Sequence, residues 1–401
     1  MMKYNFNEIV DRRNTNAMNT DGFREYIFHA DSSMKFPFED DEFVRMWVAD
    51  MEFATPDVII DGMKARLDKR IFGYTKIFDP AYYEAFKSWT TTRYGWYCEK
   101  EHLVTSNGII PALYELVDYI TEPHEKVMIF TPSYAYFKHA IDFSQRKMVC
   151  SDLVENDLYY TIDFEDMENK AKDPDMKLLI FCNPHNPSGR VWKEEELKRV
   201  AEICRRNDMY VISDEIHCDL LRNDQKHIPL AKIMPDYEKI ITCMATSKTF
   251  NMAGLMISNI IIPDDKIRFK WNERHFSFDN PVSVAAAQAA YEKGQEWLMQ
   301  LQDYLDQNLL FLRDFLQENL PKTRFRIPEA TYLAWVDVSA YLPKETELPR
   351  FFAYEAGVLL EGGNMFVQNS DSFIRLNVAM PQTMLKMGLE RIADVLKKTE
   401  R

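Results

Sequence analysis

Short apolar runs alternate with helical stretches through the middle of the chain. Five runs have the length and composition of buried strands, at residues 126–130, 177–182, 209–213, 239–245 and 259–263. Between the second and the third run, residues 194–206 carry apolar side chains at helical spacing. Strands separated by helices are typical of a mostly parallel sheet covered on both faces, so we expect an α/β fold.

Polar clusters follow three of these predicted strands. They lie at residues 183–186, 214–217 and 247–248, each just after an apolar run stops. In open α/β sheets, ligands bind beyond the carboxyl ends of the strands. We therefore expect the three clusters to converge on one site.

The pattern changes after about residue 290. A long helical stretch at 297–320 ends before Pro321, and apolar runs at 330–338 and 372–379 predict strands of a smaller α+β unit closed by a final helix. The expected division is a large domain at residues 50–290 and a small domain at residues 1–49 plus 291–401.

Composition limits the functions that the chain supports. Its 401 residues, 46% apolar and 28% charged, suffice for two packed domains. The net charge of −14 argues against binding to nucleic acid or to a membrane surface, and no run is long enough to span a bilayer. The opening MMKYNFNEIVDRRN lacks the apolar stretch of a secretory signal. Six scattered cysteines form no CxxC pair, so we expect no metal site, no redox motif and a cytoplasmic location.

Lys248 and Asp214 each follow a predicted buried strand. A lysine forms a Schiff base readily only when its amine is partly neutral, which burial favours; the alternative is a solvated surface lysine. A carboxylate such as Asp214 can keep the pyridine nitrogen of pyridoxal 5'-phosphate (PLP) protonated, so that the ring accepts electrons; the alternative is a helix N-cap. The pair indicates a candidate PLP site.

A phosphate site is predicted where TSNGIIPALYELVDYI turns from a loop into a helix. Gly108 permits close backbone approach, and Pro111 suits a first helical turn. Free N–H groups and the helix dipole attract anions to such an end, although an ordinary capped helix fits the pattern equally. Thr246 and Ser247 offer further hydroxyl donors.

Three more residues each have two interpretations. Asn186, in NPHNPSG, can hydrogen-bond a ring oxygen or form a turn. Tyr134 can lie against a cofactor ring or pack in the core. Arg375 lies in an apolar run, so its charge needs a partner, which is either a substrate carboxylate or an internal salt bridge.

The order of these motifs is more informative than any one of them. NPHNPSG, SDEIH, SKTFNMAG and FIRLN follow one another as in fold-type I PLP enzymes, the aspartate aminotransferase superfamily, which the chain resembles over nearly its whole length. MWVADMEFATP, IFGYT, TPSYAYF, SDEIHCDL and TYLAW resemble the MalY/PatB branch of cystathionine β-lyases, cystalysin and related C–S lyases. The resemblance implies the fold-type I fold, with a large domain on a mostly parallel sheet and a smaller α+β domain.

The resemblance implies a role for each candidate at the PLP ring. Lys248 would form the Schiff base, Asp214 would hold the pyridine nitrogen, and Asn186 would contact the ring oxygen. Tyr134 would stack on the ring. By the same resemblance His217 would stand beside the ring oxygen, where many aminotransferases have tyrosine and the C–S lyase branch commonly has histidine; a helix cap or a buried histidine is the alternative.

Other residues would bind the phosphate and the substrate. The phosphate would be held by Gly108, Ile109 and Ser247. Tyr74, in IFGYT, would reach the phosphate of a neighbouring subunit, which implies a homodimer with shared sites. Arg375 would bind the substrate α-carboxylate, with help from the backbone near Ala49 and Asp50.

The chain departs from the branch at three places. It reads AMNTDGF where a Lys-Trp-Asp run is usual, and EGGNMFVQNSDS lacks a common Phe-Gly. Met256 stands where many fold-type I enzymes carry a phosphate-binding arginine. These departures leave the substrate preference open.

The implied reaction is α,β-elimination of a substrate such as cystathionine or cysteine to a thiol, pyruvate and ammonia. Lys248, Asp214 and Tyr134 are the catalytic candidates. One alternative is an aminotransferase on the same fold, which needs a keto-acid acceptor and releases no ammonia. Another is a regulatory protein that keeps the fold and acts through a partner surface, although retention of Lys248, Asp214 and Arg375 argues against loss of chemistry.

Overall fold

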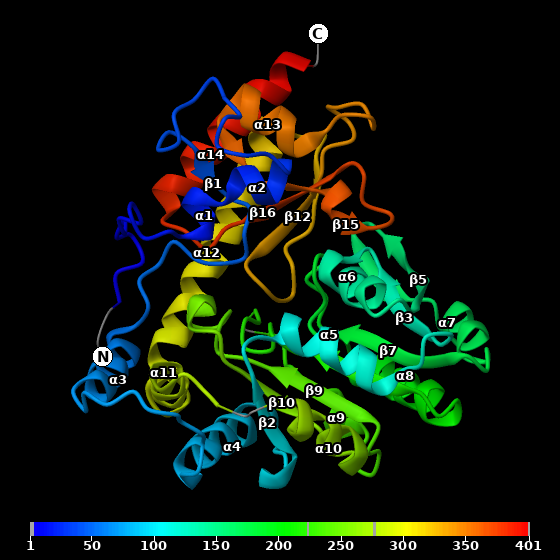
Figure 1. Cartoon of the computed structure of the whole chain (residues 1–401). Coiled ribbons are helices and arrows are strands. Elements are labelled where there is room, and N and C mark those ends of the chain that lie inside the picture. Colours follow the sequence, from blue (N-terminus) through cyan, green and yellow to red (C-terminus); the bar gives the residue numbers. More distant parts are fainter. Residues whose placement is uncertain (1–3, 223, 276–277, 400–401) are drawn as a thin grey trace.

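A mostly parallel sheet of eight strands forms the centre of the larger part of the molecule (Figure 1). The computed structural model describes residues 4–222, 224–275 and 278–399. The strands lie in the order β2 (Leu103–Ser106), β10 (Ser258–Ile261), β9 (Ile240–Met244), β8 (Tyr210–Asp214), β7 (Met176–Cys182), β3 (Lys126–Thr131), β5 (Lys147–Asn156) and β6 (Tyr159–Ile162). Strands β9, β8, β7, β3 and β5 are parallel, whereas β10 and β6 run antiparallel to their neighbours. The predicted α/β fold is confirmed.

Alternate side chains of the central strands enter two separate cores. In β3, Val127 and Ile129 pack into one core, whereas Met128 and Phe130 pack into the other. The first core is covered by α5 (Ile109–Ile120), α6 (Ala135–Phe143) and α10 (Asp265–Arg274), and the second by α7 (Phe164–Ala171), α8 (Glu194–Arg206) and α9 (Leu230–Ile233). A strand buried on both faces needs apolar residues at successive positions, which explains the continuous apolar runs.

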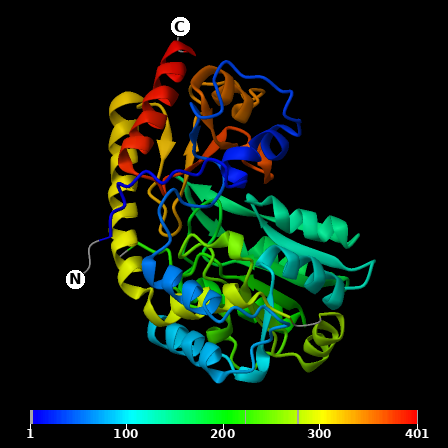
Figure 2. The same ribbon diagram turned by 60° about the vertical axis from the view of Figure 1, so that its left-hand side comes forward.

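A further group of helices leads from the large sheet to the C-terminal part. Helices α3 (Asp57–Leu67), α4 (Pro80–Tyr94) and α11 (Pro281–Lys293) pack together, and α11 continues into the long α12 (Gln295–Asn319). Figure 2 shows α12 in yellow, running alongside both parts of the molecule. None of the described helices, α12 included, is both long and apolar enough to cross a membrane.

The C-terminal part is built on a smaller antiparallel sheet, above the large sheet in Figure 1. Its strands are β11 (Arg324–Phe325), β12 (Leu333–Asp337), β16 (Phe373–Asn377) and β14 (Glu361–Gly362), with α13 (Leu348–Ala356) and α14 (Gln382–Thr399). The N-terminal segment joins this part, because β1 (Val44–Arg45) pairs in parallel with β13 (Val358–Leu359). The domain bounds at residues 50–290 and 1–49 plus 291–401 stay a prediction.

A two-stranded sheet ties the two parts together close to the end of β3. Strand β4 (Ser133–Tyr134) pairs antiparallel with β15 (Phe366–Val367), which places Tyr134 opposite Phe366. The carboxyl ends of the parallel strands therefore face the smaller sheet. The short helices α1 (Met18–Asp21) and α2 (Phe23–Phe28) lie on the same side, in dark blue in Figure 1.

Candidate active site

A cavity of about 230 Å³ lies at the carboxyl ends of the central strands. Ten of the residues predicted for a site line it: Ala49, Gly108, Ile109, Tyr134, Asn186, Asp214, His217, Ser247, Lys248 and Arg375. Asp214 ends β8 and Lys248 follows the neighbouring strand β9, so the sheet itself brings them together. The three polar clusters that the sequence predicted to converge therefore line one cavity.

Asp214 is a buried carboxylate that forms no ion pair with a cation in the described part of the chain. Its Oδ1 accepts a hydrogen bond from the Ile216 N–H at 3.2 Å, and no described side chain forms an ion pair with it. Burial raises the pKa of Asp214 to about 7, although the Ile216 N–H and the charge of Lys248 oppose the rise. An unpaired buried charge is costly, so the position favours a ligand that presents a protonated nitrogen.

Lys248 lies close to the segment 47–53. Its Nζ donates a hydrogen bond to the carbonyl oxygen of Ala49 at 2.6 Å. Burial lowers the pKa of Lys248 to about 8; the charge of Asp50 opposes this shift and that of Arg375 adds to it. Part of the amine is therefore neutral near this pH, as Schiff-base formation requires.

The N-terminus of α5 opens onto the same cavity. Gly108 precedes the helix with φ +130°, a backbone conformation that favours glycine. The N–H groups of Ile109 and Ile110 have no acceptor within the helix, because they belong to its first turn, and Pro111 has no N–H. Both N–H groups and the helix dipole can therefore bind an anion such as a phosphate.

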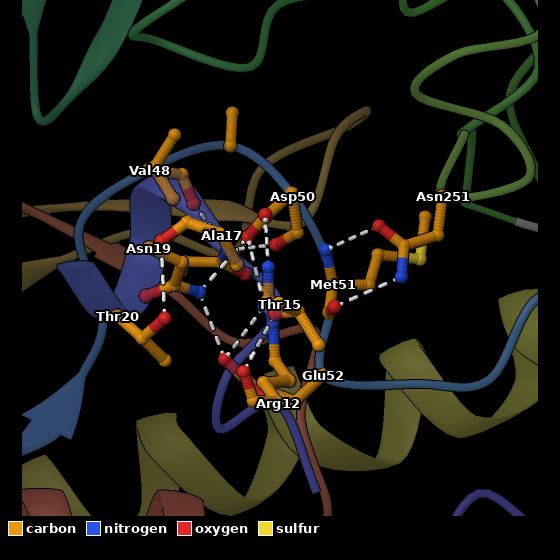
Figure 3. A network of polar contacts seen from close by, with 12 residues as sticks. Arg12, Thr15, Ala17, Asn19, Thr20, Val48, Asp50, Met51, Glu52 and Asn251 are labelled. Atoms are coloured by element: carbon orange, nitrogen blue, oxygen red, sulfur yellow. Dashed lines mark hydrogen bonds and ion pairs between the residues drawn. The ribbon is translucent and has the colours of Figure 1, made fainter. Parts of the chain in front are cut away.

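Polar contacts from the N-terminus hold one side of the segment 47–53 (Figure 3). The guanidinium of Arg12 pairs with Asp50 at 2.7 Å and with Glu52 at 3.1 Å. The Asn19 side chain donates to the same two carboxylates at 2.9 and 2.8 Å. Two acidic residues therefore anchor the segment to residues more than thirty positions earlier in the chain.

Contacts from the loop after β9 and from the small sheet hold the other side of this segment. The Asn251 side chain accepts from the N–H of Met51 at 2.8 Å and donates to its carbonyl at 2.9 Å (Figure 3). The Tyr332 hydroxyl donates to the Ala49 carbonyl at 2.9 Å, and Asn377 donates to the Asp50 carbonyl at 2.5 Å. The carbonyl that accepts from Lys248 is therefore held in place from several elements.

His217 and Asn186 supply neutral polar groups to the cavity. Burial, with the charges of Lys248 and Arg375, lowers the pKa of His217 to about 3, so its ring is uncharged at neutral pH. The Nδ1 atom of His217 is buried and has no hydrogen-bond partner among the described residues. Because this atom lines the cavity and has no partner among the described residues, it is available to a ligand there, and the ring oxygen of PLP would suit it.

Arg375 already has a carboxylate partner within the protein. Its Nη2 pairs with the Glu361 carboxylate at 2.5 Å and donates to the Trp47 carbonyl at 3.2 Å. Its Nη1 donates to the side-chain oxygen of Asn186 at 3.3 Å, and its Nε has no partner among the described residues. The internal salt bridge considered from the sequence is therefore present, inside the cavity where a substrate carboxylate was expected.

Three predicted site residues do not line the cavity. Thr246 is buried next to it, and Asp50 points toward Arg12, although its charge still acts on Lys248. Tyr74 is 92% exposed and stacks on Phe278 at 4.9 Å. Within one chain, Tyr74 therefore takes no part in the site.

Sequence reasoning missed several residues of the cavity, above all Glu361 and Tyr26. Glu361 lies directly opposite Arg375 in the pairing of β14 with β16. Strand β14 has only two residues, which is too short for an alternating pattern to predict it. The sequence therefore does not indicate that Glu361 pairs with Arg375. Tyr26 comes from α2, whose approach to the cavity depends on the tertiary fold.

The cavity fits PLP in each of its parts. Lys248 can bind an aldehyde, Asp214 a protonated pyridine nitrogen, and the first turn of α5 a phosphate. Tyr134 offers an aromatic ring, and burial raises the pKa of its hydroxyl, so that the ring stays uncharged. Fold and cavity together define an α/β enzyme of the PLP-dependent class.

Comparisons with known proteins place the chain within that class. The model of the family "Aminotransferase class I and II" matches residues 43–392, and the chain belongs to this family. Cystathionine beta-lyase PatB from Bacillus subtilis (strain 168) is 40% identical over 88% of this chain and 92% of its own length. The predicted membership of the MalY/PatB branch is confirmed.

Solved structures agree over almost the entire chain. A PLP-bound C–S lyase from Staphylococcus hominis has a TM-score of 0.95 and 51% identity, with 98% of each chain covered. Cystalysin from Treponema denticola, whose structure contains PLP, has a TM-score of 0.91 and 33% identity over 99% of this chain and 100% of its own. The predicted fold-type I fold and the predicted cofactor are thereby confirmed.

Proposed function

We propose that the protein is a PLP-dependent C–S β-lyase. It converts an L-amino acid with a sulfur leaving group on Cβ, together with water, into a thiol, pyruvate and ammonia. The observation that carries this proposal is the convergence of Lys248, Asp214 and Arg375 on one cavity beside a helix N-terminus. The likeness to PatB and to the Staphylococcus hominis C–S lyase supports the same reaction class.

Lys248 is the proposed general base. Its lowered pKa leaves part of the amine unprotonated near pH 8, so that Nζ can accept the proton of the substrate Cα. When bound, PLP supplies an electron-accepting ring that stabilises negative charge at that carbon. Asp214 would keep the ring nitrogen protonated, and the Ala49 carbonyl orients the amine of Lys248.

The remaining residues would bind and orient. The first-turn N–H groups of α5 and the Ser247 hydroxyl would hold the phosphate, and the buried Thr246 hydroxyl is a further candidate donor. Tyr134 would lie against the ring, and His217 would contact the ring oxygen as a neutral hydrogen-bonding group, with Asn186. Arg375 would bind the substrate α-carboxylate.

A homodimer is the proposed assembly, with a cytoplasmic location. Residues 71–78 expose four large apolar side chains, Ile71, Phe72, Tyr74 and Phe78, and Tyr74 stacks on the exposed Phe278. Such a surface is costly in water and is typical of a protein interface. In a dimer that buries these side chains, Tyr74 of one subunit would reach the phosphate site of the other, which is the role that the sequence predicts for it.

Pyruvate and ammonia release from cystathionine without any keto acid tests the proposed reaction. We expect Lys248→Ala to abolish release, and Lys198→Ala to leave it unchanged, because Lys198 lies on the exposed face of α8 with 54% of its side chain accessible. Undiminished release by Lys248→Ala would refute the proposal. Turnover that requires a keto acid and yields no ammonia would identify an aminotransferase instead.

A further inference from the structure

A second cavity, of about 570 Å³, lies beside the C-terminal half of α4. Residues of α4, α11 and α12 line it, together with residues 221–222 and 225–227 of the loop between β8 and α9. Among the described residues, it shares none with the lining of the cavity that fits PLP, and the proposed reaction uses none of its residues. We call it the basic cavity, because of the charges on its walls.

Positive charge gathers in the basic cavity, although the chain as a whole is acidic. The sequence has 63 acidic and 49 basic residues, which gives a net charge of −14. Among the described residues, three lysine or arginine side chains and no carboxylate line this cavity: Arg93, Arg222 and Lys226. Arg93 is balanced by Asp219, which pairs with its Nε at 2.8 Å, whereas the exposed Lys226 forms no ion pair within the described part of the chain. A concave wall of one charge sign attracts counter-ions, so this cavity favours an anion.

Arg222 is a buried guanidinium with incomplete hydrogen bonding. Only 8% of the residue is exposed, and its Nη1 and Nη2 have no hydrogen-bond partner among the described residues. Its Nε pairs with the Asp306 carboxylate at 2.9 Å. Burial lowers the pKa of Arg222, although the charges of Asp306 and Asp224 oppose the shift. Buried donors without acceptors are costly, and an oxyanion supplies two acceptor oxygens at the spacing that a guanidinium binds.

His227 provides a second buried atom that lacks a partner. Its Nε2 lies 2.7 Å from the Glu215 carboxylate. Its Nδ1 has no hydrogen-bond partner among the described residues, and the side chain lines the basic cavity. A hydroxyl group suits Nδ1 whether or not that atom carries a proton, because a hydroxyl both donates and accepts. We therefore expect a ligand of this cavity to carry a hydroxyl as well as an anionic group.

We propose that the basic cavity binds a small organic phosphate whose organic part carries hydroxyl groups. A phosphate monoester has three free oxygens and up to two negative charges, whereas a carboxylate has two oxygens and one charge. The monoester therefore matches better a wall that offers Arg222, Lys226 and the neutral donors Ser88, Thr92 and Gln225. The volume leaves room for the organic part, because small-molecule sites occupy roughly 300–1,000 Å³. This assignment does not depend on the proposed β-lyase reaction.

Calorimetric titration of the PLP-loaded protein with three matched compounds tests this site. Bound PLP fills the phosphate position at α5, so a further phosphate must bind elsewhere. Glycerol 2-phosphate carries the phosphate and two hydroxyls, isopropyl phosphate has the same carbon skeleton without the hydroxyls, and glycerate has a carboxylate in place of the phosphate. We expect one glycerol 2-phosphate per chain, bound roughly 2- to 12-fold more tightly than isopropyl phosphate, the worth of one neutral hydrogen bond. Glycerate should bind most weakly, and tighter binding of glycerate would exclude a phosphate site.

Variants of the two cations locate the bound phosphate. Arg222→Met should weaken the binding of glycerol 2-phosphate about 10- to 150-fold, the worth of a charge-assisted hydrogen bond, and Arg222→Lys should restore part of the affinity. The matched control is Arg274→Met in α10, where 62% of the arginine side chain is exposed, and it should bind normally. Lys226→Met should weaken binding about 2- to 5-fold, as expected for an exposed charge, whereas Lys198→Met should not.

Three outcomes would overturn the proposal. The first is the absence of saturable binding at millimolar concentrations, and the second is equal affinity in the wild type, Arg222→Met and Lys226→Met. Because Lys226 is exposed, its variant keeps the test valid even if Arg222→Met does not fold. The third outcome concerns Arg375→Met, which should leave the affinity unchanged: a loss there, with Arg222→Met unaffected, would place the anion in the cavity that fits PLP.

Discussion

Replacing Arg12 with methionine tests how the segment over the cavity is held. The change keeps an unbranched apolar side chain and removes the only described cation that pairs with Asp50 and Glu52. Glu52 is buried, so among the described residues its carboxylate would keep only the Asn19 amide as a hydrogen-bond partner. Breaking a fully buried pair costs about 3–5 kcal/mol and an exposed one about 0–1 kcal/mol. Because the Arg12 side chain is 19% exposed, we expect a loss of about 2 kcal/mol in the free energy of unfolding.

The loss of unfolding free energy in Arg12→Met should increase as the pH rises. Burial raises the pKa of Glu52 and Arg12 opposes the rise, so removing Arg12 raises it further. A carboxyl whose pKa is higher in the folded than in the unfolded state binds more protons when folded, and stability therefore falls as the pH rises through that interval. The difference in unfolding free energy between the wild type and Arg12→Met should therefore be larger at about pH 7 than at about pH 5.

Urea unfolding of the cofactor-free protein, at one protein concentration and at both pH values, measures this deficit. Arg13→Met is the matched control: Arg13 is the next residue, its side chain is 75% exposed, and it pairs with the exposed Asp11. We expect no measurable change in that control. Equal unfolding free energies for Arg12→Met and Arg13→Met would show that the Arg12 contacts do not stabilise the segment.

Three further predictions concern the cavity. The rate of pyruvate release should rise with pH to a plateau above about 8, because Lys248 accepts a proton only when neutral; a flat profile would argue against it as the base. Asp214→Asn should lower kcat by about 100-fold or more in pyruvate assays, whereas the exposed Asp208→Asn should not. Gly108→Ala should weaken PLP binding in equilibrium dialysis, because φ is +130° there, while Gly254→Ala, with open space around the new Cβ, should bind PLP normally.

The large sheet and most of its polar clusters could be predicted because each strand and each cluster is marked by neighbouring residues in the sequence. A strand buried on both faces must be apolar along its length, and a polar residue that follows it marks where the strand ends. Asp214 and Lys248 illustrate this: each was placed at a strand end from its own neighbours in the sequence, and parallel pairing of β8 with β9 brings the two together. The antiparallel direction of β10 had no comparable signal.

Contacts between distant segments could not be predicted, and the reason is combinatorial as well as physical. The apolar run around Arg375 indicates that its charge needs a partner, but the chain offers 63 acidic residues, and nothing in the sequence near Glu361 distinguishes it from the others. The pairing of Arg12 with Asp50 and Glu52 poses the same problem. Long charged side chains can form ion pairs across many different backbone arrangements. Which residues pair therefore depends on the tertiary fold, and no periodic pattern in the sequence marks them. Residues that reach a site through long-range pairing are therefore the ones that sequence reasoning is least able to find, and Glu361, which lines the cavity and pairs with Arg375, is such a residue.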